Sequence, residues 1–182
     1  CGQLAEWIAN GRDPGVIAVN VSVQQFREKS FVDHVRATLS RFGISASQLK
    51  IEVTESLLMT EQEQAAKLLG ELRALGLHLS IDDFGTGYSS LSYLRTLPID
   101  ELKIDRSFLV DVDSSTDSAA IVRAILALAH SLDMTVVAEG VETLEQLAFL
   151  RAHGCDACQG FLFSKAVPAA EYQALLPQLV TV

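Results

Sequence analysis

Short apolar runs alternate along the chain with longer stretches in which apolar residues recur every three or four positions. The short runs predict strands and the longer stretches predict helices, because side chains alternate along a strand and share one face of a helix at that longer spacing. The predicted strands are residues 17–22, 49–53, 78–82, 101–104, 135–139 and 156–161.

The predicted helices end at recognisable positions. Gly43 follows the first apolar stripe, where a left-handed cap is expected, and Pro168 marks the first turn of a last helix. The stripes cover residues 31–42, 68–75, 121–132 and 144–150. Strand–helix alternation of this kind predicts a parallel sheet with helices outside it. No linker or low-complexity tract divides the chain, so we expect one domain over residues 1–182.

The number of units favours a barrel with part of it missing. Six units in 182 residues are about 30 residues each, whereas a closed (β/α)8 barrel needs eight strands and about 250 residues. A helical stretch without its strand opens the chain, so the two missing units are expected upstream of Cys1. The isolated chain is then expected to associate through unpaired strand edges. An open doubly wound sheet is the alternative, but residues 21–24 are not its usual Gly-rich turn.

Composition limits the partners and the compartment. The chain has 14 Lys plus Arg and 23 Asp plus Glu, a net charge of −9, which argues against passive binding to DNA, RNA or anionic membranes. An apolar fraction of 49% excludes a disordered chain. Three cysteines are too few for a disulfide framework, so we expect a cytoplasmic protein. A part outside this chain can still anchor the full-length protein to a membrane.

Polar residues stand near the carboxyl ends of the predicted strands. In a barrel these ends carry the catalytic groups. A solvated strand terminus explains any one such residue, but the recurrence in all six strands favours a functional site. The residues are Asn20, Glu52, Asp82, Asp83, Lys103, Glu139 and Gln159.

The four carboxylates among them indicate metal ions. Packing Glu52, Asp82, Asp83 and Glu139 together is costly without counterions, and one lysine cannot neutralise them. Oxygen ligands suit Mg²⁺ or Mn²⁺ better than zinc. The adjacent aspartates suggest two ions with Asp82 between them, the usual clamp for displacement at phosphorus. The ions would also let an acidic protein hold an anionic phosphodiester.

Three further motifs are similar to those of other kinds of protein, but none supports such a function here. Asp83-Phe84-Gly85 is similar to a protein-kinase motif, but the catalytic and Gly-rich loops of kinases are absent. The glycines of Gly85-Thr86-Gly87 lack the third glycine of a dinucleotide fingerprint; we interpret them as hinges of a mobile loop, with a tight turn as the alternative. Cys155 and Cys158 lie three positions apart at a predicted strand and should face opposite ways, so zinc or redox use is not expected.

Five of these motifs together resemble the EAL domain of bacterial cyclic-di-GMP phosphodiesterases. They are Ile51-Glu52-Val53-Thr54-Glu55-Ser56, Asp82-Asp83-Phe84-Gly85-Thr86-Gly87-Tyr88-Ser89-Ser90, Leu102-Lys103-Ile104-Asp105, Ala138-Glu139-Gly140-Val141-Glu142 and Gln159-Gly160-Phe161-Leu162-Phe163-Ser164-Lys165. The resemblance implies a (β/α)8-type barrel with one antiparallel strand. It also implies hydrolysis of cyclic di-GMP to linear pGpG with two Mg²⁺ or Mn²⁺ ions. Ca²⁺ is expected to inhibit, because its longer and looser coordination spoils the spacing of the two ions.

The resemblance also implies a role for each matching residue. Lys103, Glu139 and Asp83 would be catalytic, with Lys103 positioning or deprotonating the attacking water. The first metal would take Asn20, Glu52 and Asp82, and the second Asp82, Asp83 and Glu139. Gln159 and Phe161 would contact substrate, Phe161 at a guanine. Glu55 would hold the loop of residues 83–90, and Glu142 would support the site.

Two departures from the family pattern leave alternatives open. The Glu-Ala-Leu motif, whose glutamate is a metal ligand, is not in the chain and is expected upstream of Cys1; Ala166 replaces a common proline. The chain is therefore either a phosphodiesterase or an inactive domain that acts as a cyclic-di-GMP receptor or protein-interaction module. A barrel enzyme for another phosphate ester is a third reading. The family also implies a homodimer and an attached sensory or GGDEF domain.

Overall fold

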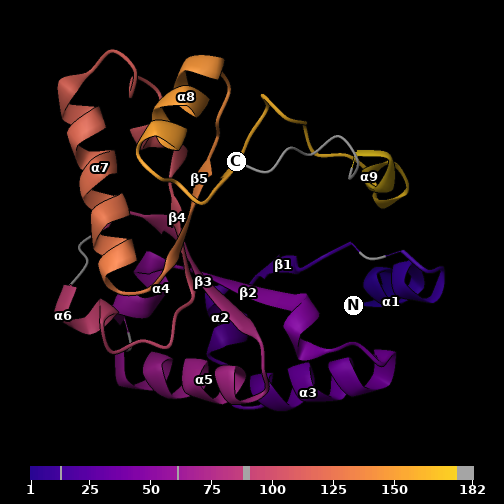
Figure 1. Ribbon diagram of the computed structural model, residues 1–182. Helices are drawn as coiled ribbons and strands as arrows, with labels where there is room; N and C mark the ends of the chain where they lie inside the picture. Colours follow the sequence, from indigo (N-terminus) through magenta and orange to yellow (C-terminus); the bar gives the residue numbers. More distant parts are fainter. Residues whose placement is uncertain (13, 61, 88–90, 176–182) are drawn as a thin grey trace. The chain divides into compact units, whose positions relative to one another are not determined.

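Six strands form one sheet in the computed structural model, which describes residues 1–12, 14–60, 62–87 and 91–175. The strands follow one another in the sheet in chain order, β1 to β6, as expected of successive strand–helix units (Figure 1). They are β1 (Ile17–Asn20), β2 (Leu49–Thr54), β3 (His78–Phe84), β4 (Glu101–Ile104), β5 (Thr135–Glu139) and β6 (Ala157–Gln159).

All six predicted strands are confirmed, and four of them differ at their ends; β2 runs one residue further than predicted, to Thr54. β1 ends at Asn20 because Ser22 is the N-cap of α2 (Val23–Phe26) and accepts a hydrogen bond from the Gln25 N–H at 3.3 Å. β3 runs two residues further than predicted, to Phe84. β6 is only three residues long, because a bend precedes it and a turn follows it.

The chain forms two compact units, which are described separately. The first comprises the described residues of 1–80 and 89–99, and the second those of 81–88 and 100–182. β3 begins in the first unit and ends in the second.

In the first unit, β1 and β2 are parallel, with Asn20 opposite Glu52 at their carboxyl ends. β2 is mostly buried, whereas three of the four residues of β1 are exposed. The helices of this unit are α1 (Gly2–Ala9), α2, α3 (Phe31–Phe42), α4 (Glu55–Thr60), α5 (Gln62–Ala74) and α6 (Leu91–Leu94), with the short η1 (Ala46–Gln48). The predicted cap at Gly43 is confirmed, with φ 64°.

In the second unit, β4, β5 and β6 are parallel neighbours. All four residues of β4 are buried, and α7 packs against both β4 and β5. The helices are η2 (Arg106–Phe108), α7 (Thr116–Ser131), α8 (Leu144–Ala152) and α9 (Ala169–Leu175). Pro168 precedes α9, and its carbonyl accepts the N–H groups of Glu171 and Tyr172. Helix α8 starts with a capping box between Thr143 and Gln146.

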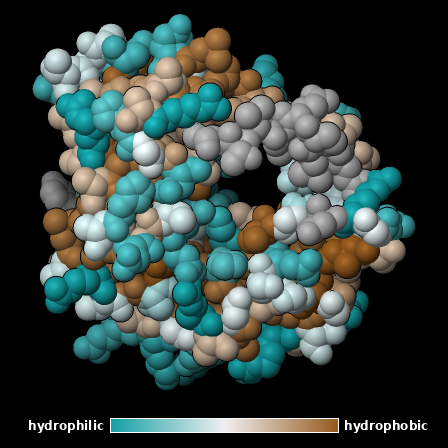
Figure 2. Space-filling view, viewed as in Figure 1, coloured by the Kyte–Doolittle hydropathy of each residue, from teal (hydrophilic) through white to brown (hydrophobic). Residues whose placement is uncertain are grey.

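Hydrophilic side chains cover most of the face drawn in Figure 2, with hydrophobic ones between them, as expected of a chain with net charge −9. Within the described ranges, none of the helices has the length and apolar character needed to cross a bilayer.

Candidate metal centre

Three carboxylates of the second unit come together at the strand ends. Asp82, Asp83 and Glu139 each offer one oxygen, and these oxygens lie within 4.8 Å of one another. Asp82 is 9% exposed, and the other two are half-buried. A set made only of carboxylate oxygens fits Mg²⁺ or Mn²⁺, which prefer oxygen ligands, better than zinc.

The backbone at Asp83 explains why two consecutive residues serve the same cluster. Along a regular strand, Asp82 and Asp83 would point to opposite faces. Asp83 instead has φ 56°, in the left-handed region, which aspartate tolerates better than most residues. Its N–H donates to Oδ1 of Asp82 at 3.0 Å. The Thr86 hydroxyl donates to the Asp83 carbonyl at 2.8 Å and closes a tight turn.

Lys103 supplies the positive charge within this cluster. Its side chain is buried in β4, and Nζ lies 3.1 Å from Oδ1 of Asp82 and 2.5 Å from Oε1 of Glu139. One ammonium against three ionised carboxylates leaves a formal charge of 1 − 3 = −2. The cluster therefore favours a further cation.

The pKa of Asp83 is raised first by burial and then by this excess of negative charge. Burial raises the pKa above its ordinary 3.8, and the carboxylates of Asp82 and Asp105 raise it further, while Lys103 acts in the opposite direction. Neighbouring negative charge makes ionisation of Asp83 less favourable. A divalent cation at this position would relieve the repulsion.

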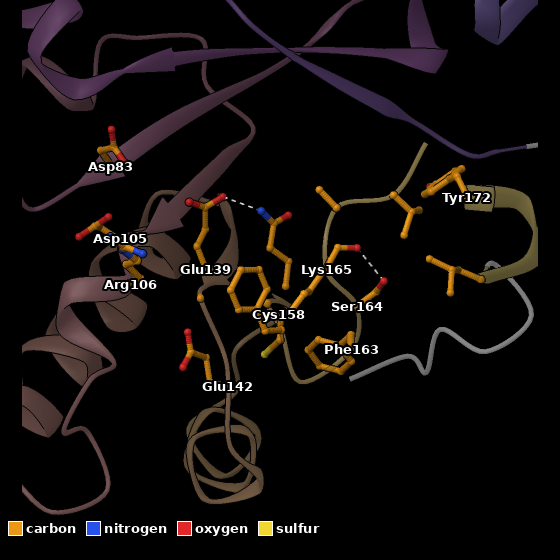
Figure 3. Close-up of a pocket in the computed structure, with 17 residues that line it drawn as sticks. Asp83, Asp105, Arg106, Glu139, Glu142, Cys158, Phe163, Ser164, Lys165 and Tyr172 are labelled. Carbon is orange, nitrogen blue, oxygen red and sulfur yellow. Dashed lines mark hydrogen bonds between the residues drawn. The ribbon is translucent and has the colours of Figure 1, made fainter. Parts of the chain in front are cut away.

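Gln159 is tied directly to the cluster. The register of β5 and β6 places Gln159 opposite Glu139, and Nε2 of Gln159 donates to Oε1 of Glu139 at 2.9 Å, the upper dashed line in Figure 3. Oε1 of Glu139 therefore accepts from both Gln159 and Lys103, which fixes the direction of this carboxylate.

The carboxylates open onto a cavity of about 850 Å³ that lies within the second unit. This volume is within the range of small-molecule sites. Asp83, Glu139 and Glu142 line one part, and Tyr172 of α9 lines another (Figure 3). The cavity thus combines an acidic end with aromatic walls, which suits a ligand carrying both phosphate, bound through cations, and ring systems.

Phe161 and Glu142 lie where the sequence predicted site residues. The Phe161 ring lines the cavity, is 63% exposed, and has Nζ of Lys165 5.7 Å from its centroid. Glu142 is exposed at the cavity, and its backbone N–H donates to Oε1 of Gln146 at 2.7 Å. Contact of Phe161 with a guanine and the supporting role of Glu142 stay predictions.

Two cavity residues, Asp105 and Arg106, were given no role by the sequence. Asp105 caps η2 by accepting the Ser107 N–H at 3.0 Å. Burial alone would raise the pKa of Asp105, but the Ser107 and Arg106 hydrogen bonds and the Arg106 charge hold it below 3.8. Gly140 leaves room for Arg106, since a Cβ at Gly140 would overlap that of Arg106. Asp105 directly follows β4, so the expectation that polar residues near strand ends are functional could have found it. Arg106 carries no such signal.

The remaining predicted ligands lie in the first unit. Asn20 and Glu52 are opposite each other at the ends of β1 and β2, and Glu52 is 7% exposed. Glu55 is the first residue of α4 and is 2% exposed. The predicted loop that Glu55 would hold includes residues 88–90, which lie outside the described residues. The roles of these three side chains stay predictions.

The expectation that Cys155 and Cys158 face opposite ways was wrong. The Cys155 thiol donates to the carbonyl of Ala157, next to Cys158, at 3.2 Å, and the two thiols shift each other's pKa. Cys155 precedes β6, and the chain bends at Asp156, so strand alternation does not apply to it. Cys158 lines the cavity.

Comparison with known proteins agrees with this fold and centre. Among curated relatives, cyclic di-GMP phosphodiesterase NbdA of Pseudomonas aeruginosa is 48% identical over 176 residues, 97% of this chain and 22% of NbdA. The bifunctional diguanylate cyclase/cyclic di-GMP phosphodiesterase MucR of the same species is 47% identical over 174 residues, 96% of this chain and 25% of MucR. The chain thus spans about a quarter or less of these relatives.

Solved structures are similar over nearly the whole chain. The PaMucR phosphodiesterase in complex with c-di-GMP has a TM-score of 0.90 at 47% identity, covering 94% of this chain and 69% of that one. The manganese/cy-diGMP complex of Klebsiella pneumoniae BlrP1 has a TM-score of 0.81 at 35% identity, covering 90% of this chain and 41% of that one.

The fold and the acidic centre define an α/β protein of strand–helix units with a candidate metal site at its strand ends. The EAL domain profile matches residues 1–166, so the chain belongs to the EAL domain family. Its fold class is that of the family's (β/α)8-type barrel, and the described residues form six parallel-sheet strands of it.

Proposed function

We propose that this chain hydrolyses cyclic di-GMP to linear pGpG with the aid of two Mg²⁺ or Mn²⁺ ions. The observation that carries the proposal is the cluster of Asp82, Asp83 and Glu139 around the buried Lys103, at the acidic end of a large cavity. Support comes from family membership and from the cyclic-di-GMP complexes of PaMucR and BlrP1.

Five residues would hold the ions in this proposal. Asp82, Asp83 and Glu139 would hold one ion, which agrees with the separation of their oxygens. Asn20 and Glu52, together with Asp82, would hold the other, an assignment that rests on the family motifs. When bound, divalent cations act as Lewis acids that lower the pKa of water and compensate negative charge at phosphorus.

Lys103 and Gln159 would orient the reacting groups. The Lys103 ammonium is held by Asp82 and Glu139, so it can donate a hydrogen bond to an incoming water or to a phosphate oxygen nearby. Gln159 fixes Glu139 through its amide N–H, and its carbonyl oxygen can accept from the attacking water. Each role needs only the positions these side chains already occupy.

The walls of the cavity would bind the rest of the substrate. Phe161 offers an exposed aromatic face for a guanine base. Glu55 would hold the loop that carries Asp83, and Glu142 would support the acidic end from the cavity wall.

The wider setting of the domain is part of the same proposal and is supported by its membership of the family. We place the protein in the cytosol, in keeping with its free thiols, as a homodimer regulated by an attached sensory or GGDEF domain. The whole of residues 1–182 would belong to the EAL domain, with further strands and the Glu-Ala-Leu glutamate supplied upstream.

The deciding experiment separates turnover from binding. The protein at its natural length is incubated with cyclic di-GMP and Mn²⁺, and the products are separated by chromatography, with binding measured in parallel by calorimetry in Ca²⁺. Formation of pGpG supports the proposal, and Asp82→Asn should abolish it. Binding without any pGpG would instead show a cyclic-di-GMP receptor, and neither binding nor turnover would point to a different phosphate ester.

A further inference from the structure

The Cys155–Cys158 pair lies beside the metal centre but takes no part in the proposed chemistry. Cys155 is buried, with 6% exposure, and Cys158 is half-buried at the cavity wall. Cys158 directly precedes Gln159, the residue that fixes Glu139. Figure 3 shows Cys158 close to the Glu139 side of the cavity.

The Cys155 thiol lies beside the peptide bond that joins Ala157 to Cys158. Its S–H donates to the carbonyl of Ala157 at 3.2 Å, and its Sγ lies 3.6 Å from the carbonyl of Val136. The two thiols are close enough for each to shift the pKa of the other. Both cysteines are free thiols. A buried thiol next to a second, cavity-facing thiol is the usual arrangement of a resolving and a reacting cysteine.

The electrostatic environment separates the two thiols. A hydrogen bond that the Cys155 thiol can donate to the ionised Cys158 lowers the pKa of Cys158, and the Arg151 charge adds to this effect against the cost of burial. The same hydrogen bond, burial and the Cys158 charge raise the pKa of Cys155. Cys158 is therefore the thiol that ionises first, and the thiolate is the reactive form.

We propose that Cys155 and Cys158 are a reversible oxidation site, at which a disulfide formed by a peroxide lowers turnover by moving Gln159. This inference goes beyond the proposed function, and its consequence for turnover rests on that function.

The chemistry balances with hydrogen peroxide as oxidant. The Cys158 thiolate attacks one peroxide oxygen, the O–O bond breaks, and hydroxide leaves, so that Cys158 becomes a sulfenic acid. The Cys155 thiol then attacks the Cys158 sulfur, the S–S bond forms, and the S–O bond breaks. The Cys155 proton and the leaving hydroxide form water. The two thiols lose two electrons, and the peroxide gains them.

The disulfide would act through β6. Oxidation removes the thiol proton that Cys155 donates to Ala157, inside the strand. It also ties Cys158, which pairs with Ala138 in the β5–β6 register, to the bend before β6. Gln159 is the next residue, so its hydrogen bond to Glu139 is expected to weaken. The loss of one such hydrogen bond corresponds to about a tenfold fall in turnover.

The site can be tested by mass, independently of activity. Trypsin cleaves after Arg151 and Lys165, so residues 152–165 form one peptide that holds both cysteines. The natural-length protein is treated with hydrogen peroxide, free thiols are alkylated, and the mass of the peptide is measured by mass spectrometry. We expect a peptide that is not alkylated and is two hydrogens lighter than its dithiol form. Dithiothreitol should return it to the dithiol form. A peptide that stays alkylated at both cysteines overturns the proposal.

Variants assign the roles of the two thiols. In Cys155→Ala, peroxide should leave Cys158 as a sulfenic acid, which dimedone traps. In Cys158→Ala, dimedone should trap no sulfenic acid at Cys155. The control Cys1→Ser should behave like the unaltered protein. Trapping at Cys155 instead of Cys158 would contradict the order of attack.

Turnover is compared within each protein, before and after peroxide. Turnover of the unaltered protein should fall about tenfold and recover with dithiothreitol. Cys155→Ala should form no disulfide in the 152–165 peptide and should therefore show no loss of turnover that accompanies one. A disulfide that leaves turnover unchanged overturns the switch. If the reduced protein has no turnover at all, the proposed function fails, and the peptide mass still decides whether the disulfide forms.

Discussion

Lys103 and Glu139 form an ion pair in which Nζ and Oε1 are 2.5 Å apart, between neighbouring parallel strands. The same ammonium lies 3.1 Å from Oδ1 of Asp82. Because the Lys103 side chain is only 5% exposed, solvent screens these ion pairs weakly. Lys103 thus stabilises the carboxylate cluster in the absence of metal, in addition to the role in the reaction that we propose for it.

Lys103→Met should destabilise the metal-free protein by about 3–5 kcal/mol, because it leaves two partly buried carboxylates without their ammonium. Saturating Mn²⁺ should recover part of this loss, since the ion restores positive charge. Thermal unfolding in EDTA and in Mn²⁺ measures both effects. Lys67→Met is the matched control: its ion pair with Glu71 is 4.0 Å long and exposed, so it should change stability by less than about 0.5 kcal/mol. Equal effects of the two substitutions would contradict the buried role of Lys103.

Asp83 should make stability depend on pH in a direction that metal reverses. Its folded pKa is raised, so its contribution to stability is present below 3.8 and is lost as the pH rises through the folded pKa. Asp83→Asn should therefore stabilise the metal-free protein at neutral pH and have little effect below pH 3.8. In Mn²⁺ the substitution should destabilise, because a ligand is lost. Unfolding curves across pH, with and without metal, measure both effects. If Asp83→Asn were no more stable than the unaltered protein in EDTA at neutral pH, this prediction would be contradicted.

Gly160→Ala should disturb the end of β6. A Cβ at Gly160 would overlap the backbone N, C and O atoms of Val141, which cannot move aside cheaply. We expect a loss of about 1–3 kcal/mol and reduced turnover, since Gln159 is adjacent. Gly70→Ala is the control: Gly70 lies within α5 and a Cβ there meets nothing within 4 Å, so it should stabilise by about 0.5–1 kcal/mol. A neutral Gly160→Ala would show that β6 is free to shift.

The strands were predictable because each is a short apolar run between turn signals. The expectation that polar residues gather at the carboxyl ends of strands placed Asp82, Lys103, Glu139 and Gln159 correctly. Two features of the backbone could not be predicted from the sequence. The left-handed conformation of Asp83 brings it beside Asp82 against strand alternation. The bend at Asp156 does the same for Cys155. Both depend on local backbone geometry that hydrophobic periodicity does not encode, as does the helix cap formed by Asp105.

Calcium should inhibit turnover that Mg²⁺ or Mn²⁺ supports. Ca²⁺ binds oxygen ligands at longer distances and with looser geometry than Mg²⁺, so it would occupy the carboxylates without the compact spacing that two-metal displacement needs. Initial rates at fixed Mn²⁺ and rising Ca²⁺ measure this effect. Equal rates with Ca²⁺ alone and Mg²⁺ alone would contradict the two-metal geometry.

In the function that we propose, the carboxylates around Lys103 hold the cations that the hydrolysis of cyclic di-GMP requires. Its most direct test is the rate of pGpG formation by the natural-length protein, first stripped with EDTA and then titrated with Mn²⁺. We predict no turnover in EDTA, recovery with rising Mn²⁺, and a shift of the titration to higher Mn²⁺ in Asp83→Asn. Turnover that persists undiminished in EDTA would contradict the account.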